Sequence, residues 1–434
     1  MNLPYFIARR VALTGNRGFS RTILRIAVGS VALCVAVMLL TTALITGFKN
    51  EVGNKIFGFW GHIHITSTSV NRGLLEAIPI TKNQSFYPSL DTLGSVRYLE
   101  DLSDPNSFSE PVYREAFTHG GVRHIQTFAL KPGIIKSKDQ IEGIVLKGVG
   151  TDFDWAFFEQ YLIAGEVLRF EEDKMSNGIL ISEETANRLD VGVGDKFIAH
   201  FVQGNDQLRR AFRVDGIYRT GLAEFERKLA LVDIRKIQQL LGWSEDEVGG
   251  FEVFVEDIRD LQPLTEYLYY EVVPSDLYAQ SIRRKFPNLF EWLELQDINE
   301  YVIVGLMLTV GIINMITALL ILILERTNMI GTLKALGATD WTIRRIFLYY
   351  AAYILGWGLL LGNALGLLIG FLQKQFEFVK LSEKDYILSV APIEFNWWVI
   401  LGLNLGILIV TLLFMLLPTI LVARITPVRA IRFK

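Results

Sequence analysis

The sequence predicts an α-helical membrane protein with four transmembrane helices and a large α+β domain inserted between the first and the second helix. Four long apolar runs without a charged side chain carry the first part of this prediction. At about 1.5 Å of rise per residue, each run is long enough to cross a hydrocarbon core of about 30 Å. The four runs are 26–48, 301–324, 346–372 and 397–423. The segment 49–300 has the mixed polar and apolar pattern of a water-soluble domain, which supplies the second part.

Basic residues set the expected orientation of these helices. The first 50 residues hold five arginines, one lysine and no acidic residue, and the segments 325–345 and 424–434 also carry more basic than acidic residues. Because positively charged loops stay on the cytoplasmic side, we expect both termini and the loop 325–345 in the cytoplasm. The domain 49–300 and the loop 373–396 then lie outside. This arrangement fits the inner membrane of a bacterium, with a periplasmic domain.

The segment 1–25 is predicted to be a cytoplasmic amphipathic segment. Its residues 3–13 are basic and amphipathic, and Pro4 suits a first helical turn. A cleaved signal peptide is the alternative, since a basic start before an apolar run fits both. The run 26–48 is longer than the usual core of a signal peptide, and no small-residue cleavage site follows it. The sequence therefore favours a retained helix.

Short apolar patterns within 49–300 predict strands and capped helices. The expected strands are 62–66, 179–181, 197–202, 212–218 and 251–255, and the expected helices are 182–189, 233–241 and 260–270. Ser182 is expected to cap the first of these helices. His62 and His64 would share one face of the first strand and could bind a metal, but two such ligands without acids nearby favour an ordinary surface strand.

The loop 325–345 is predicted to hold a short helix with one apolar face, because four apolar residues recur at spacings of three and four. They are Met329, Ile330, Leu333 and Leu336. Gly337 is expected to end this helix, and Thr339 or Asp340 to cap the next one. A helix of this kind suits docking against another protein. The alternative is a loop helix that lies on the bilayer surface.

Small residues at helical spacing predict at least one close helix interface in the third and fourth spans. They are Gly362, Gly366 and Gly370 in the third span, and Gly402 and Gly406 in the fourth. The interface could lie within one chain or between two. Asn314 is a lone polar residue in the second span, and a hydrogen bond between helices explains it. Trp397 and Trp398 mark the bilayer interface at the start of the fourth span.

The common signatures of catalysis are missing from the sequence. A Walker A loop needs Gly-x-x-x-x-Gly-Lys-Ser/Thr, and the nearest stretch, 143–148, is followed by Val149. His-Glu-x-x-His and Gly-x-Ser-x-Gly do not occur. The single cysteine, Cys34, cannot form a disulfide or a thiolate metal site within one chain. We therefore expect a chain that is not an enzyme and holds no cofactor or metal.

Charge excludes two further classes of function. The formal net charge is only −3, so nothing indicates a nucleic-acid binder. The four spans contain no charged residue, whereas an ion or proton pathway usually needs ionisable groups at membrane depth. The sequence therefore favours spans that carry motion over spans that conduct ions.

Glu325-Arg326 and the following Ile330-Gly331-x-Leu333-Lys334-Ala335-Leu336-Gly337 resemble the coupling segment of the ABC transporter permease superfamily typified by the MacB, FtsX and LolC/LolE proteins. In that superfamily the segment sits in a groove of a separate ATPase subunit, which binds the ATP. The resemblance implies that ten residues contact an ATPase: Glu325, Arg326, Met329, Ile330, Gly331, Leu333, Lys334, Ala335, Leu336 and Gly337.

The rest of the chain is similar to the same superfamily. Residues 179–195 look like the strand, helix and Gly-Asp turn of a MacB-like periplasmic core domain, and 212–232 look most like the lipoprotein-releasing branch. In one subunit of that branch, a loop grips the soluble lipoprotein carrier. The corresponding candidate loop is Thr220, Gly221, Leu222, Ala223, Glu224, Phe225, Glu226 and Arg227, for which a plain hairpin loop is the alternative. Residues 386–392 and 418–432 resemble the outer loop and the C-terminal pattern.

The resemblance implies a permease subunit of the lipoprotein-releasing LolC/LolE type. Such a subunit would transmit ATPase motion to its periplasmic domain, extract lipoproteins from the inner membrane and pass them to a periplasmic carrier. The implied partners are an ABC ATPase, a second permease subunit (the same chain or a paralogue), an acylated lipoprotein, a carrier and membrane lipid.

Three alternatives remain open. A MacB-like efflux permease would carry a fused amino-terminal ATPase, which this sequence does not contain. An FtsX-like regulator of a cell-wall hydrolase usually has a smaller outer domain. An unrelated anchored receptor would not need the pattern of 325–337.

Overall fold

The computed structural model describes Phe6 and the residues 19–70, 78–103, 112–136, 141–171, 175–203, 206–222, 226–382, 386 and 388–420. Most of the predicted segment 1–25, the last residues of the predicted fourth span and the whole predicted tail 424–434 lie outside these residues. The chain forms two compact units. We call them the membrane unit (Met1–Glu51, Glu291–Lys380 and Val390–Lys434) and the sheet unit (Val52–Phe290 and Leu381–Ser389).

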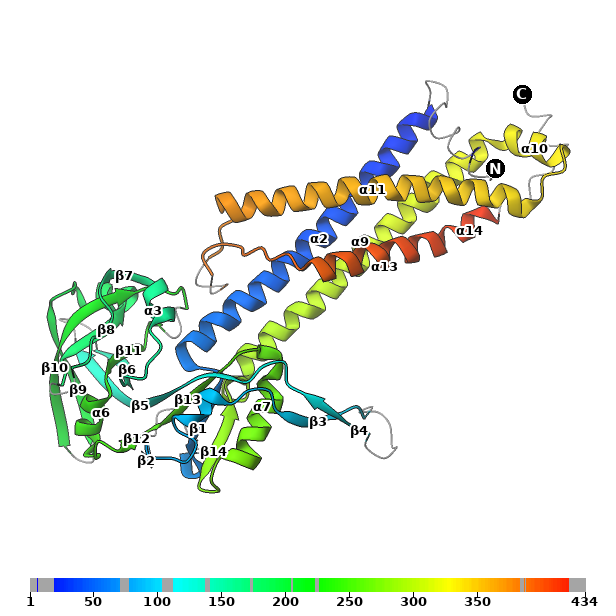
Figure 1. Ribbon diagram of the computed structural model, residues 1–434. Helices are drawn as coiled ribbons and strands as arrows, with labels where there is room; N and C mark the ends of the chain where they lie inside the picture. Colours follow the sequence, from blue (N-terminus) through cyan, green and yellow to red (C-terminus); the bar gives the residue numbers. More distant parts are fainter. Residues whose placement is uncertain are drawn as a thin grey trace. The chain divides into compact units, whose positions relative to one another are not determined.

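Long apolar helices make up the membrane unit (Figure 1). They are α2 (Phe19–Trp60), α9 (Pro287–Glu325), α11 (Asp340–Phe376) and α13 (Trp397–Phe414). The short helix α10 (Thr327–Ala335) lies between α9 and α11, and the short helix α14 (Leu416–Thr419) follows α13. By length and composition, four segments could cross a membrane: Thr22–Trp60, Pro287–Glu325, Asp340–Phe376 and Trp397–Thr419. The four predicted spans fall on these segments. The helix α2 is longer than its predicted span, and α9 begins before the apolar run 301–324, close to the start near Leu289 that the sequence predicts, because the chain is helical into residues of the sheet unit at both places.

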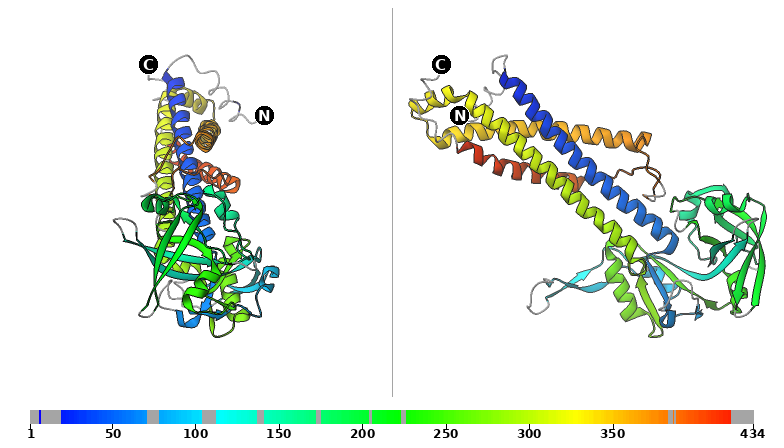
Figure 2. Two further views of the ribbon diagram at one scale, coloured as in Figure 1. Left: turned by 90° about the vertical axis from the view of Figure 1, so that its left-hand side faces the viewer. Right: turned by 180° about the vertical axis from the view of Figure 1, so that it is seen from behind.

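Apolar side chains from all four long helices fill the core of the membrane unit. The buried members include Val35 and Met38 of α2, Met315 and Leu319 of α9, Phe347 and Ile354 of α11, and Ile407 of α13. The helices α2 and α9 lie side by side in each view (Figures 1 and 2). Thr339 caps α11 by accepting a hydrogen bond from the amide of Thr342, as the sequence predicts.

A ten-stranded mixed sheet forms the sheet unit, in the order β14-β1-β13-β5-β6-β11-β8-β10-β7, with β9 paired to β10 and β5. The strands are β1 (Ile63–Ser67), β5 (Val122–Lys136), β6 (Ile141–Val149), β7 (Leu162–Gly165), β8 (Gly178–Ser182), β9 (Lys196–Gln203), β10 (Asp206–Tyr218), β11 (Leu229–Asp233), β13 (Gly250–Val255) and β14 (Leu277–Ser281). The pairs β10·β8 and β11·β6 are parallel, and the other ladders of this sheet are antiparallel.

Short elements complete the sheet unit. Two small two-stranded sheets are β2 (Ile80–Thr81) with β12 (Glu247–Val248), and β3 (Arg97–Asp101) with β4 (Tyr113–Phe117). The helices are α3 (Ala156–Gln160), α4 (Glu183–Leu189), α6 (Ile234–Leu241), α7 (Leu261–Tyr267) and α8 (Ile282–Lys285). Aliphatic and aromatic side chains of the strands, with those of α6 and α7, form one continuous core.

The five predicted strands are confirmed, and β10 begins six residues earlier than expected, at Asp206. The first two predicted helices are confirmed as α4, capped by Ser182, and α6, capped by Asp233. The third ends at Tyr267 and continues as a π-helical turn. The prediction that the first strand lies on the surface is wrong. Strand β1 pairs with a neighbour on both sides, and the side chain of His64 is only 1% exposed.

Candidate functional site

The predicted coupling segment folds as α10, between the ends of α9 and α11. Ile330 is fully buried, and Met329 and Leu333 are half-buried against the core of the membrane unit. The apolar face of α10 therefore packs on the chain's own helices. Leu336 was expected on the same face, and this prediction is wrong, because its side chain is 80% exposed. The helix α10 ends at Ala335, one residue before Leu336, so helical spacing does not apply to the side chain of Leu336.

A glycine turn locks the end of α10. Gly337 has a φ of +91°, in the left-handed region, and its amide donates to Lys334 O at 3.0 Å. The amide of Ala338 donates to Leu333 O at 3.0 Å, which completes a Schellman motif. The Lys334 ammonium lies 2.8 Å from a carboxylate oxygen of Asp340, at the start of α11. The predicted helix stop at Gly337 is confirmed, and the turn ties α10 firmly to α11.

The predicted coupling residues thus divide into two sets. The inward set packs on the membrane unit and consists of Met329, Ile330, Gly331 and Leu333. The outward set is exposed and consists of Glu325, Ala335, Leu336 and Gly337, to which the structure adds Asn328 and Thr332. Arg326 and Lys334 are half-buried. Only the outward set is open to another molecule.

Two of the predicted packing glycines let α11 approach α2 closely. A Cβ atom on Gly362 would lie 2.7 Å from Ala32 O, and one on Gly366 would lie 3.3 Å from the Cα of Ala36. Gly358, which the sequence analysis did not single out, meets Val31 in the same way at 2.5 Å. The interface between α11 and α2 therefore has no room for a larger side chain at Gly362.

The other predicted glycines lie elsewhere. A Cβ atom on Gly370 would meet the ring of Phe395, which lies in the loop before α13. At Gly402 and Gly406, no other atom of the described chain lies within 4 Å of the Cβ position. The glycine motif of α13 is thus unused within one chain.

Uncharged amides join the membrane helices in pairs. Asn314 of α9 donates to Ser30 Oγ of α2 at 2.5 Å, the kind of bond that the lone asparagine predicted. Asn363 of α11 and Asn404 of α13 exchange two hydrogen bonds, at 2.6 and 3.0 Å. The second pair was missed, although two asparagines in apolar runs were a visible signal.

The base of the candidate carrier loop is closed by a buried carboxylate. Glu226 is 4% exposed, and its Oε1 accepts hydrogen bonds from the amide and hydroxyl of Thr220 and from the amide of Gly221. Leu222 is buried beside it, and Ser182 Oγ donates to the carbonyl of Glu226 at 2.7 Å. Arg227 is paired with a glutamate of α4. The remaining members, Ala223, Glu224 and Phe225, lie outside the described residues.

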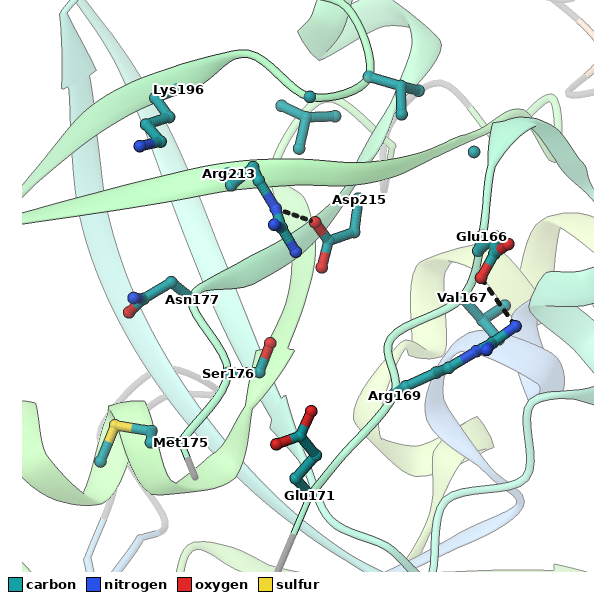
Figure 3. A pocket seen from close by; sticks show the side chains of 14 residues that line it. Glu166, Val167, Arg169, Glu171, Met175, Ser176, Asn177, Lys196, Arg213 and Asp215 are labelled. Carbon is teal, nitrogen blue, oxygen red and sulfur yellow. Dashed lines mark hydrogen bonds and ion pairs between the residues drawn. The ribbon is translucent and has the colours of Figure 1, made fainter. Parts of the chain in front are cut away.

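The sheet unit also has an open polar cavity of about 760 Å³ beside β10 (Figure 3). Four of the six charged side chains in its lining form two ion pairs. Arg213 Nε lies 2.7 Å from Asp215 Oδ1, and Arg169 Nη2 lies 2.8 Å from Glu166 Oε2. Among the described residues, no group of three or more His, Cys, Asp or Glu side chains could hold a metal ion.

These features define a class of membrane protein, with four apolar helices, a mixed α/β domain after the first helix and a short locked helix between the second and third. Residues 301–427 match the family model described as FtsX-like permease C-terminal. This match covers most of α9 and all of α10, α11, α13 and α14. The helices and the relatives below indicate a bacterial inner membrane protein with an extracellular domain.

Curated relatives match along almost the whole chain. The chain is 22% identical to the lipoprotein-releasing system transmembrane protein LolE of Haemophilus influenzae, over 99% of each chain. It is 21% identical to the corresponding LolC protein of Xylella fastidiosa, over 100% of this chain and 98% of the relative. This homology supports an ABC permease, a class of subunits that is generally non-catalytic.

One solved structure is also similar, the extracellular domain of the noncanonic ABC-type transporter YknZ from Gram-positive bacteria. The superposition covers 37% of this chain and 81% of that chain, with 12% identity and a TM-score of 0.25.

Proposed function

We propose that this chain is a permease subunit of an ATP-driven ABC complex that extracts lipoproteins from the bacterial inner membrane and passes them to a periplasmic carrier. The observation that carries the proposal is the length of the similarity. Relatives named for lipoprotein release match 99% and 100% of this chain, so both its units have a counterpart in them. The excess of basic residues in the first 50 residues and in 325–345 supports cytoplasmic termini and a cytoplasmic α10.

The outward face of α10 is the proposed docking surface for the partner ATPase, which binds the ATP. Leu336 is 80% exposed, and burial of an apolar side chain of this size against a partner would contribute about 1.5–3 kcal/mol. The inward residues Ile330 and Leu333 have another role in this proposal, because they hold α10 against the other helices. A force that the ATPase applies to Leu336 then moves α10 as a rigid body, and the turn at Gly337 transmits this movement to α11.

The lipid-facing sides of α2 and α9 are the proposed contacts for acyl chains. On α9, a stripe at spacings of three and four is exposed: Val302, Leu306, Val310 and Ile313. On α2, Leu33 is 60% exposed. Apolar side chains that are exposed in the described part of the chain suit either lipid or a second permease subunit. Acyl chains held between two such subunits would stay in apolar surroundings until they are released.

The loop that begins at Thr220 is the proposed contact for the periplasmic carrier. Its base is fixed by the carboxylate of Glu226, which limits the entropy that the loop loses on binding. A plain hairpin loop would not need a buried carboxylate at its base.

Reconstitution of the native complex tests the proposed function. The chain is purified from its own membranes with the subunits that accompany it, placed in proteoliposomes with a palmitate-labelled lipoprotein, and supplied with ATP and periplasmic extract. We expect ATP-dependent transfer of label to the soluble fraction, and none with a non-hydrolysable ATP analogue. ATP hydrolysis without transfer of label would contradict the proposal, and so would a preparation that contains no ATPase.

A further inference from the structure

The outer end of α2 passes into the sheet through a single glycine. Gly61 follows the last helical residue, Trp60, with a φ of +68°, and its amide donates to Phe57 O at 2.7 Å. The next residue, His62, already donates its amide to Val253 O of β13 at 2.9 Å. A linker that short leaves little room for bending between the helix and the sheet.

Side chains from the sheet hold the last carbonyl groups of α2. The Nζ atom of Lys147, on β6, donates to Phe59 O at 2.5 Å. The ring of His64, on β1, is hydrogen-bonded to Trp60 O. The last carbonyls of a helix lack partners inside the helix and carry the negative end of its dipole, so an ammonium group binds there favourably.

A buried carboxylate completes this cluster. Glu252 of β13 lies opposite His64 in the β1–β13 register, and its two carboxylate oxygens lie 2.7 and 2.9 Å from Lys147 Nζ. Gln126 of β5 donates to the same carboxylate at 2.8 Å. Both members of the ion pair are 0% exposed. The ring of Trp60 lies beside the ammonium group, 5.5 Å from its centroid.

The cluster also reaches the start of α9. Lys285, the last residue of α8, lies with its Nζ atom 2.7 Å from His64 Nδ1. Two residues later, Pro287 begins α9. Burial lowers the pKa of Lys285 to about 8, with Glu252 opposing and Lys147 assisting the shift. The outer end of α2 and the start of α9 therefore contact the same few side chains.

Stability alone does not explain a fully buried ion pair. Taking two charges out of water costs several kcal/mol per ion, and well-packed apolar residues of similar volume often stabilise a core as well or better. What charged groups add is a fixed position for the groups that they bind. The ammonium group of Lys147 fixes the position of the helix end through Phe59 O and of the sheet through Glu252. Apolar packing would let the helix end rotate or slide.

We propose that Lys147, Glu252 and His64 form an ionic clasp that fixes the outer end of α2 to the sheet, so that a movement of α2 in the transport cycle moves the sheet with it. Lys285 extends the clasp to the start of α9. The proposal rests on the proposed function only in assuming that ATP drives the movement of α2. The clasp residues are positioning residues and touch no cargo.

The test compares two double variants in the reconstituted complex. Lys147→Met with Glu252→Gln removes one positive and one negative charge from the clasp. Arg97→Met with Glu115→Gln removes the same charges from an ion pair that is exposed by 65% and 64%. The readouts are ATP hydrolysis, palmitate-labelled lipoprotein released per ATP, and hydrogen exchange of the sheet unit with and without vanadate-trapped nucleotide.

We expect the clasp variant to hydrolyse ATP within about twofold of the unsubstituted complex. Its release per ATP should fall at least about tenfold, while the exposed-pair variant should release normally. Trapped nucleotide should alter exchange in β1 and β13 of the unsubstituted chain and of the exposed-pair variant, but not of the clasp variant. A merely structural role would lower hydrolysis and release together.

Several results would overturn the clasp. One is unchanged release per ATP in the clasp variant. Another is a change in hydrogen exchange of β1 and β13 on nucleotide trapping that persists in the clasp variant. The third is the absence of this change in the unsubstituted chain. If the clasp variant does not fold, Lys285→Met replaces it in the test, because this substitution leaves the ion pair intact. It should lower release per ATP at least about threefold, and unchanged release would overturn the proposal. If no complex releases lipoprotein, the proposed function fails, and the exchange readout still decides about the clasp.

Discussion

The two units of the chain bury polar groups in different ways. The membrane unit joins its helices with uncharged amides, such as the reciprocal pair of Asn363 and Asn404. The sheet unit buries a lysine and a glutamate, Lys147 and Glu252, with no exposed surface on either side chain. The membrane unit also has an ion pair between α2 and α9, Lys49 with Asp297, but it is about one third exposed and lies outside the apolar runs.

The difference follows from what each environment can supply. A charge at the centre of a bilayer costs about 2.5–3.5 kcal/mol or more, whereas two amides can satisfy each other without charge. In the sheet unit, the ammonium group of Lys147 donates to the carbonyl of Phe59, and the amide of Gln126 donates to the carboxylate of Glu252. A buried charge is tolerated where fixed dipoles replace water, and the end of a helix offers such dipoles.

The largest expected effect comes from breaking the ion pair on one side. Lys147→Met leaves the carboxylate of Glu252 buried without its ammonium partner, so we expect the sheet unit to lose about 3–5 kcal/mol of unfolding free energy. Adding Glu252→Gln should restore much of this loss, because no unpaired charge remains. Urea unfolding of the full chain in detergent measures both variants. A single variant as stable as the double variant would show that the pair is not coupled.

A charge in the core of the membrane unit should have the next largest effect. Leu333→Asp places a carboxylate on the inward face of α10 and should destabilise the membrane unit by about 2–3 kcal/mol. Leu336→Asp places the same charge on the outward face, so the fold should persist. Thermal unfolding in detergent separates the two.

Binding of the ATPase is the second property to measure for the outward face of α10. If the outward face docks, Leu336→Asp should weaken binding at least about tenfold, or about 1.4 kcal/mol, in a copurification or titration assay. Thr332→Ser, a mild change on the same face, is the matched control. Undiminished ATPase binding by a well-folded Leu336→Asp variant would remove α10 from the docking surface.

Glycine positions on α11 and α13 should differ for a steric reason. In Gly362→Ala, the new methyl group would lie 2.7 Å from Ala32 O, so α11 and α2 must separate, at a cost of about 1–3 kcal/mol. Gly402→Ala meets no described atom within 4 Å and should leave the stability of a single chain unchanged. Unfolding of the two variants in detergent tests this. A loss at Gly402 that appears only in the assembled complex would place a second subunit against α13.

The parts predicted well depend on local signals. The spans were found because an apolar run of sufficient length is itself the requirement for crossing a bilayer. Caps at Ser182 and Thr339 were visible because a capping side chain acts within three residues. Leu336 was placed on the packed face by its spacing, but it is the C-terminal cap residue of α10 and its side chain is 80% exposed.

The parts that were missed depend on distant contacts. Strand β5 contains Lys131-Pro132-Gly133, which reads as a turn, but Gly133 is needed because the ring of Phe201 would overlap a Cβ atom there. The clasp was missed for a stronger reason. His64, Lys147 and Glu252 are far apart in the sequence, and each has the polarity of a surface residue. Only the strand order brings them together.

The amide pair in the membrane unit should have a smaller effect than the ion pair. Asn363→Ala leaves the amide of Asn404 in apolar surroundings without its partner, so we expect a loss of about 1–2 kcal/mol. Replacing both asparagines with leucine should cost less than the single change, since no polar group is then left unpaired. Unfolding of the three chains in one detergent gives the coupling between the two sites. Strict additivity of the two changes would mean that the hydrogen bonds do not contribute.

The smallest expected effect is a dependence on pH that the sheet unit shows through its buried histidines. Burial, assisted by Arg123, lowers the pKa of His62 to about 3, and burial with the nearby Lys285 holds the pKa of His64 well below its usual value. Both folded-state pKa values lie below the value of about 6.5 in an unfolded chain. Between these values the unfolded chain binds protons that the folded chain does not, so acid favours unfolding.

The stabilising contribution of His62 is therefore complete above about pH 6.5 and decreases as the pH falls toward 3. From pH 7.5 to 5.5 it should fall by about 1.4 kcal/mol. Urea titrations of the full chain at each pH, read by protease access to residues 52–290, measure the loss. His62→Gln removes the titrating group, so this variant should lose about 1.4 kcal/mol less over the same interval. Identical losses in both chains would mean that His62 binds no more protons in the unfolded chain than in the folded chain, which would contradict the lowered pKa of its buried ring.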